Sequence, residues 1–81
     1  MPLFWASRNG HVKVVSLLIA KGSQVNIATD QGSTPLSTAC GFAHEEVVKL
    51  LIENGADVNT ANNNGATPLR LVVTSYFIYF A

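Results

Sequence analysis

Apolar residues recur at helical spacing in two neighbouring stretches near the middle of the chain. In the first stretch, Leu36, Ala39 and Cys40 lie three or four residues apart, which predicts a short helix of about two turns. The pair Thr34-Pro35 just before it is a helix start signal, because the threonine hydroxyl can cap free backbone N–H groups and proline at the first helical position loses no hydrogen bond.

The second stretch predicts a helix that opens at His44 and stops at Asn54-Gly55, where glycine tolerates the left-handed conformation. Its apolar surface consists of Val47, Val48, Leu50, Leu51 and Ile52. Its solvent-exposed side consists of Glu45, Glu46, Lys49 and Glu53. The two stretches together predict a pair of helices that pack against each other.

The same pattern returns at a fixed interval. Pro2, Pro35 and Pro68 stand 33 residues apart, and residues 2–31 match residues 35–64 at 13 of 30 positions. A period between about 20 and 50 residues indicates a stack of repeats, each of which buries its apolar face against its neighbours. We therefore predict a mainly α-helical repeat solenoid with a partial repeat at 1–31, a complete repeat at 32–64 and a partial, divergent repeat at 65–81.

Asn- and Gly-rich segments separate the helix pairs. They predict β-hairpin loops near residues 22–33 and 55–66, because both residue types tolerate positive φ. The third unit begins like the others at Thr67-Pro68, which predicts one added helix at 68–77.

These residues resemble ankyrin repeats, over residues 2–70. The matching strings are Gly32-Ser33-Thr34-Pro35-Leu36, His44-Glu45-Glu46-Val47-Val48-Lys49-Leu50-Leu51 and, most diagnostic, Asn54-Gly55-Ala56-Asp57-Val58-Asn59. The resemblance implies helix-turn-helix units joined by hairpin loops, and a protein–protein interaction scaffold that binds its partner through a concave face.

The chain also departs from the family pattern. The histidine that usually follows Thr-Pro-Leu is replaced by Phe4, Ser37 and Arg70. We expect its hydrogen bond to the capping threonine to be absent. Ala43 occupies a glycine position, which costs about 1 kcal/mol if that backbone is left-handed. Thr29 and Asn62 replace an aspartate, so we expect a less stable array.

Composition narrows the function further. Five Lys and Arg residues balance five Asp and Glu residues without a basic stripe, which argues against nucleic-acid binding. A single cysteine and the lack of a secretion signal pattern predict an intracellular protein, cytoplasmic or nuclear. The longest apolar stretch, residues 71–81, falls short of the roughly 20 residues that a spanning helix needs.

Few residues of the sequence are candidates for a catalytic or metal-binding role. His11, His44 and Cys40 could be offered as metal ligands, but the histidines are repeat equivalents at a structural position of the family. Cys40 lies at a packing position rather than beside a base. Glu45 and Glu46 are adjacent on a helix and point in different directions. We expect no enzyme activity, no metal, no cofactor and no small-molecule substrate.

The resemblance assigns partner binding to the hairpin tips and the ends of the first helices. These positions are Arg8, Asn9, Ala28, Asp30, Gln31, Ser33, Gly41, Phe42, Ala61, Asn63, Asn64 and Ala66. Phe42 is either an interface anchor or packs under the neighbouring hairpin. Trp5 is assigned to the core or to a loose end.

Alternatives to a self-contained scaffold stay open. The chain could be an accessory repeat segment of a larger enzyme, channel or membrane-associated protein, or a non-functional gene fragment. Both ends lack a polar outer face, so we expect marginal stability and self-association through uncapped ends.

Overall fold

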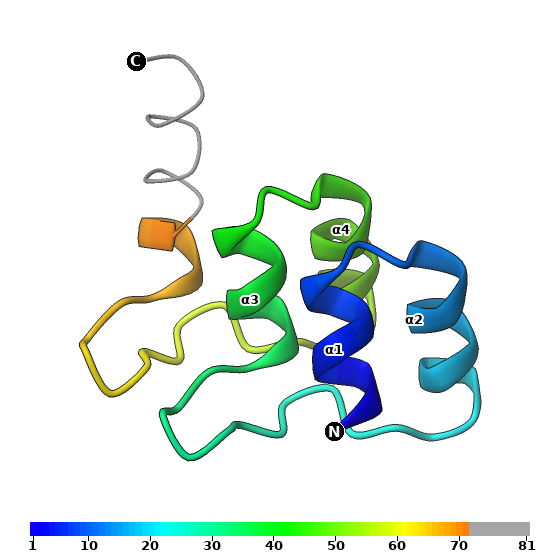
Figure 1. The fold of residues 1–81 in the computed structure, drawn as a ribbon, viewed down its shortest axis with the longest axis horizontal. Helices are drawn as coiled ribbons and strands as arrows, with labels where there is room; N and C mark the ends of the chain where they lie inside the picture. Colours follow the sequence, from blue (N-terminus) through cyan, green and yellow to red (C-terminus); the bar gives the residue numbers. More distant parts are fainter. Residues whose placement is uncertain (72–81) are drawn as a thin grey trace.

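The computed structural model describes residues 1–71 of the 81-residue chain. Two antiparallel helix pairs follow each other along the chain (Figure 1). The helices are α1 (Pro2–Arg8), α2 (Val12–Ala20), α3 (Pro35–Gly41) and α4 (Glu45–Glu53). Residues 68–71 begin a further helix, and the rest of the helix predicted at 68–77 lies outside the described residues. The predicted helix pairs are confirmed.

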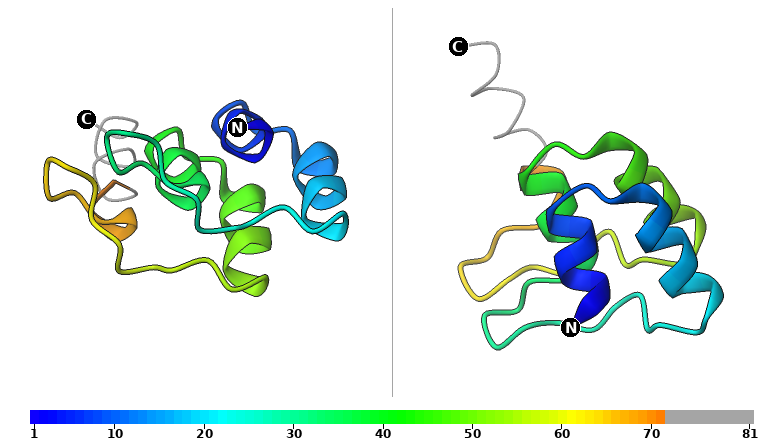
Figure 2. Two further views of the ribbon diagram at one scale, coloured as in Figure 1. Left: turned by 90° about the horizontal axis from the view of Figure 1, so that it is seen from below. Right: turned by 45° about the vertical axis from the view of Figure 1, so that its right-hand side comes forward.

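The helices form two layers. Helices α1 and α3 lie side by side in one layer, and α2 and α4 lie behind them in the other (Figures 1 and 2). Two long loops connect the layers and extend past α1 and α3, on the side away from α2 and α4 (Figure 2). We call the side formed by α1, α3 and these two loops the inner face.

The core lies between the layers and across the junction of the two repeats. It comprises Leu3, Ala6, Val15, Leu36, Ala39, Cys40, Val47, Leu51 and Ala56. All of these except Cys40 and Ala56 are at apolar positions that repeat every 33 residues. Small residues at Ala6 and Ala39 allow the two layers to approach closely. Burial of leucine and valine side chains contributes about 1.5–3 kcal/mol each, so the core supplies most of the driving force for folding.

Helix α3 begins with the cap that the sequence predicts. Thr34 has an extended backbone, its Oγ1 accepts a hydrogen bond from the backbone N–H of Ser37 (3.1 Å), and Pro35 follows at the first helical position. Ser37 completes the cap, because its Oγ accepts from the Thr34 N–H (2.8 Å) and donates to the Thr34 carbonyl (2.9 Å). A serine thus stands where the family pattern has histidine, and it makes its own side-chain hydrogen bonds to the capping threonine.

Both loops turn back on themselves as hairpins, although residues 1–71 contain no β-strand. In the first loop the Thr29 N–H donates to the Ser33 carbonyl (2.8 Å), and Thr29 Oγ1 accepts from the Ser33 N–H (3.2 Å). In the second loop the Asn62 N–H donates to the Ala66 carbonyl (2.9 Å), and Asn62 Oδ1 accepts from the Ala66 N–H (3.0 Å). Thr29 and Asn62 thus both accept a hydrogen bond within their loops, at the positions where the family pattern has aspartate.

The turn between α3 and α4 contains a strained alanine. Ala43 has φ of +57°, whereas the equivalent position in the first repeat is Gly10 with φ of +72°. The condition stated from the sequence is therefore met, and the left-handed conformation costs this alanine about 1 kcal/mol. A Cβ at Gly10 would lie 2.7 Å from the His44 ring, so glycine is required where the two repeats meet.

Candidate functional site

The ends of α1 and α3 carry a cluster of exposed aromatic and cationic side chains on the inner face. The guanidinium carbon of Arg8 lies 4.9 Å from the centre of the Phe42 ring and 5.4 Å from the centre of the Trp5 ring. Both distances fall within the range of cation–π attraction. We call Trp5, Arg8 and Phe42 the aromatic–arginine cluster.

The junction between the repeats holds this cluster in place. His44 Nε2 lies 2.9 Å from the Arg8 carbonyl oxygen, which can only accept, so this nitrogen carries the proton and donates. The His44 ring also stacks on Phe42 with centroids 6.3 Å apart and planes 17° apart. One histidine therefore fixes the end of α1 and orients the aromatic ring at the end of α3.

Phe42 is an exposed side chain and does not pack under the neighbouring hairpin. It is 51% exposed, because it follows the last residue of α3 at the opposite end from the loops. Of the two interpretations open at the sequence level, the structure supports the exposed aromatic. Exposed aromatics of this kind are enriched in interface hot spots.

Trp5 is the residue of this cluster that sequence reasoning missed. It is 54% exposed rather than part of the core, and its ring packs edge-on against Phe4 with centroids 5.5 Å apart. Trp5 stands one turn before Arg8 on α1, so the i, i+3 spacing of an aromatic and an arginine was the available signal.

The tips of the two loops form a second group on the inner face, at the opposite end of α1 and α3 from the aromatic–arginine cluster. Asn63 Nδ2 donates to the Asp30 carbonyl (3.0 Å), and the Asn63 N–H donates to the Gln31 carbonyl (2.9 Å). The Asp30, Gln31 and Asn63 side chains are exposed. A Cβ on Gly32 would lie 2.9 Å from Asn63 Oδ1, so the loops touch and present one continuous edge.

The remaining candidate residues differ in how much surface they offer. Asn9, Ala28, Gly41, Ala61 and Asn64 are exposed. Ser33 is half-buried in its hairpin, and Ala66 is 8% exposed, so these two offer a partner little surface. The structure therefore brings the sequence-predicted residues into two groups, with Arg8 and Phe42 in one and Asp30, Gln31 and Asn63 in the other.

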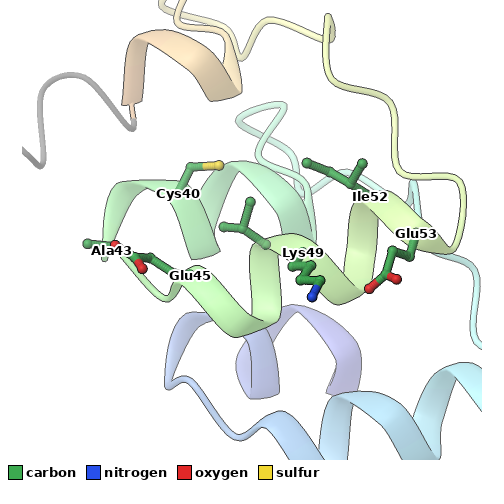
Figure 3. A pocket seen from close by; sticks show the side chains of 7 residues that line it. Cys40, Ala43, Glu45, Lys49, Ile52 and Glu53 are labelled. Atoms are coloured by element: carbon green, nitrogen blue, oxygen red, sulfur yellow. The ribbon is translucent and has the colours of Figure 1, made fainter.

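A third feature is an open apolar groove on the face of α3 and α4 that points away from the first repeat (Figure 3). Its volume is about 370 Å³, and Cys40, Ala43, Val48 and Ile52 line it with Glu45, Lys49 and Glu53. The equivalent face of the first repeat is covered by the second repeat, where Val15 is completely buried. The groove is thus the face on which a further repeat would stack.

Cys40 is a packing residue of this groove. It is 2% exposed, and burial raises the pKa of its thiol to about 11. A thiol with this pKa stays protonated at neutral pH, whereas a nucleophile or metal ligand is a thiolate. In the part of the chain that the structure describes, no three His, Cys, Asp or Glu side chains gather as a metal site would require, and no helix is long and apolar enough to cross a membrane.

Comparison with known families and structures decides what this architecture is. The family model described as ankyrin repeats (3 copies) matches residues 3–76. The chain belongs to the ankyrin repeat family. Its paired helices and projecting loops are therefore ankyrin repeats, as the resemblance of residues 2–70 implied.

A solved ankyrin structure matches the fold closely. The crystal structure of the human ASB11 ankyrin repeat domain is 39% identical in sequence and has a TM-score of 0.90 over 93% of the present chain. The chain spans about a third of that structure, because the match covers 34% of it. Comparison with curated proteins gives no significant match.

Proposed function

We propose that this ankyrin array binds a partner protein through its inner face, with contacts from the aromatic–arginine cluster and from the loop tips at Asp30, Gln31, Asn63 and Asn64. The observation that carries the proposal is the exposure of Trp5 and Phe42 beside Arg8. Tryptophan and arginine are among the residue types that most often dominate binding energy at protein interfaces.

The outer charged side of α4 is the weaker candidate for docking. Glu46, Lys49 and Glu53 are exposed, and such solvated charges contribute little binding energy when they lie at the rim of an interface. Ankyrin repeat regions are typically non-catalytic, so the proposal assigns the chain no reaction. In this proposal the protein is a scaffold that binds its partner inside the cell, in the cytoplasm or the nucleus.

Site-specific photo-crosslinking tests this proposal in cells that express the full 81-residue chain. A photoreactive phenylalanine analogue at position 42 or 63 should give a crosslink to the same discrete protein. The same analogue at position 49, on the charged side of α4, is the control and should not give that crosslink. Equal crosslinking from position 49, or no discrete product from either inner-face position, contradicts the proposal.

A second candidate function is that of an accessory repeat segment within a larger protein. The open groove beside Val48 and Ile52 favours it, because the corresponding face of the first repeat packs against a following repeat. Fusion of one ankyrin helix pair after residue 71 should then raise the urea midpoint of unfolding. An unchanged midpoint would count against this candidate.

A further inference from the structure

The aromatic–arginine cluster leaves the hydrogen-bonding groups of one cation unused. Within residues 1–71 the Arg8 guanidinium makes ring contacts and no hydrogen bond or ion pair. A guanidinium carries five N–H donors in a fixed planar fork and accepts nothing. The side chain is therefore in contact with apolar rings while its donors face water or a ligand.

The Trp5 and Phe42 rings also restrict the conformations that the Arg8 side chain can adopt. Trp5 lies on the same helix as Arg8, and Phe42 comes from the other repeat, where His44 holds its ring. An arginine that is held in this way loses less conformational entropy when it binds than a freely moving one. The Arg8 guanidinium is therefore preorganised for donating hydrogen bonds, unlike a mobile arginine on the surface.

We propose that the aromatic–arginine cluster recognises one carboxylate side chain, Asp or Glu, next to an apolar side chain in the bound segment of the partner. This inference rests on the proposed function and names the chemistry of its ligand. A planar carboxylate matches the arginine fork through two parallel hydrogen bonds. The exposed ring surfaces of Trp5 and Phe42 accommodate the apolar neighbour.

The charges around the cluster favour a single carboxylate. Arg8 is the one cation in contact with these rings among the described residues, whereas phosphate is usually recognised by several arginines. Glu46 is exposed and lines a groove with His44, the residue that contacts both Arg8 and Phe42. Its carboxylate would repel a run of acidic residues, so the ligand carries an isolated carboxylate.

Peptide selection on the whole 81-residue chain supplies a ligand for the test. Random 12-residue peptides displayed on phage are selected on the wild-type chain alone, so that the selection does not itself require Arg8. We expect the selected peptides to share one Asp or Glu beside an apolar residue. Their synthetic forms, made without tryptophan, are then titrated against the protein.

Trp5 reports binding at the cluster directly, because it is the single tryptophan of the chain. A peptide carboxylate at Arg8 should change its fluorescence, and Arg8→Gln should weaken binding at least tenfold. Arg8→Lys should also weaken binding, since a lysine keeps the charge but loses the planar fork. Lys13→Gln, on the exposed side of α2, removes the same charge elsewhere and should leave binding unchanged.

A double-mutant cycle assigns the effect to the proposed pair of groups. Replacing the peptide Asp or Glu by its amide should cost tenfold with the wild-type chain and little with Arg8→Gln. Phe42→Leu, with Arg8 intact, should give an intermediate loss, and it serves as the second variant if Arg8→Gln unfolds.

Three results would overturn the inference. The inference fails if the peptides bind equally well as amides, if they bind more tightly with a phosphoserine in place of the Asp or Glu, or if they lose affinity with Asn63→Ala but not with Arg8→Gln. The last result leaves the proposed inner-face function standing and removes the carboxylate site alone. A selection that yields no binding peptide contradicts both.

Discussion

At the scale of single residues, two buried serines lie in opposite situations. Ser37 is 4% exposed and makes three hydrogen bonds with Thr34. Ser7 is completely buried, and its Oγ has no hydrogen-bond partner among the described residues. An unsatisfied buried hydroxyl costs about 1–3 kcal/mol of desolvation.

The serines therefore predict opposite responses to the same substitution. Ser7→Ala should raise the free energy of unfolding by about 1 kcal/mol, because it removes a hydroxyl that gains nothing from folding. Ser37→Ala should lower it by about 1–2 kcal/mol, because it removes half of a helix cap. Urea unfolding followed by circular dichroism measures both, and a loss of stability in Ser7→Ala would show that its hydroxyl is satisfied in solution.

At the scale of elements, the loops are connected between repeats by asparagine side chains. Asn26 Oδ1 accepts from the Asp57 N–H (2.8 Å), and Asn26 Nδ2 donates to the Gly55 carbonyl (3.2 Å). These bonds join the loop after α2 to the end of α4. Asn59 is the equivalent residue of the second repeat, and its side chain makes no hydrogen bond between repeats within residues 1–71. The two asparagines can therefore be compared directly by mutation.

Asn26→Ala should lower the free energy of unfolding by about 1 kcal/mol, because two hydrogen bonds between repeats are lost at a partly solvated site. Asn59→Ala is the control and should change it by less than about 0.5 kcal/mol. Urea unfolding of both variants measures the difference. Equal losses would mean that the asparagine acts within its own loop rather than between repeats.

The sequence predicts these elements better than it predicts their contacts. The 33-residue register and the Thr34-Pro35 cap follow from the sequence pattern, and the structure has both. At the sequence level the cost of a left-handed Ala43 is only conditional, and the structure meets that condition. The exposure of Trp5 and the approach of Arg8 to Phe42 depend on how α1 packs against α3, which no local pattern encodes. The partner-binding role of Arg8, Phe42 and the loop tips remains a prediction.

At the scale of the whole molecule, the same apolar face is covered in the first repeat and open in the second. Ile19 packs against the core where the second repeat covers it. Its equivalent Ile52 is 47% exposed in the open groove. Val58, which is 44% exposed, lines an adjoining hollow together with Ile52. Exposed apolar patches of this kind mark interaction sites or association between copies.

The equivalent isoleucines therefore predict unequal effects of one substitution. Ile19→Lys should lower the free energy of unfolding by about 2–4 kcal/mol, because a charge enters an apolar contact. Ile52→Lys should cost less than about 1 kcal/mol and reduce self-association of the 81-residue chain. Urea unfolding at low concentration and sedimentation at high concentration measure the two effects. If Ile52→Lys is as costly as Ile19→Lys, the groove is covered in solution. A cost that grows with protein concentration then identifies a second copy as the cover, and a cost that disappears when the chain is cut after Leu71 identifies residues 72–81.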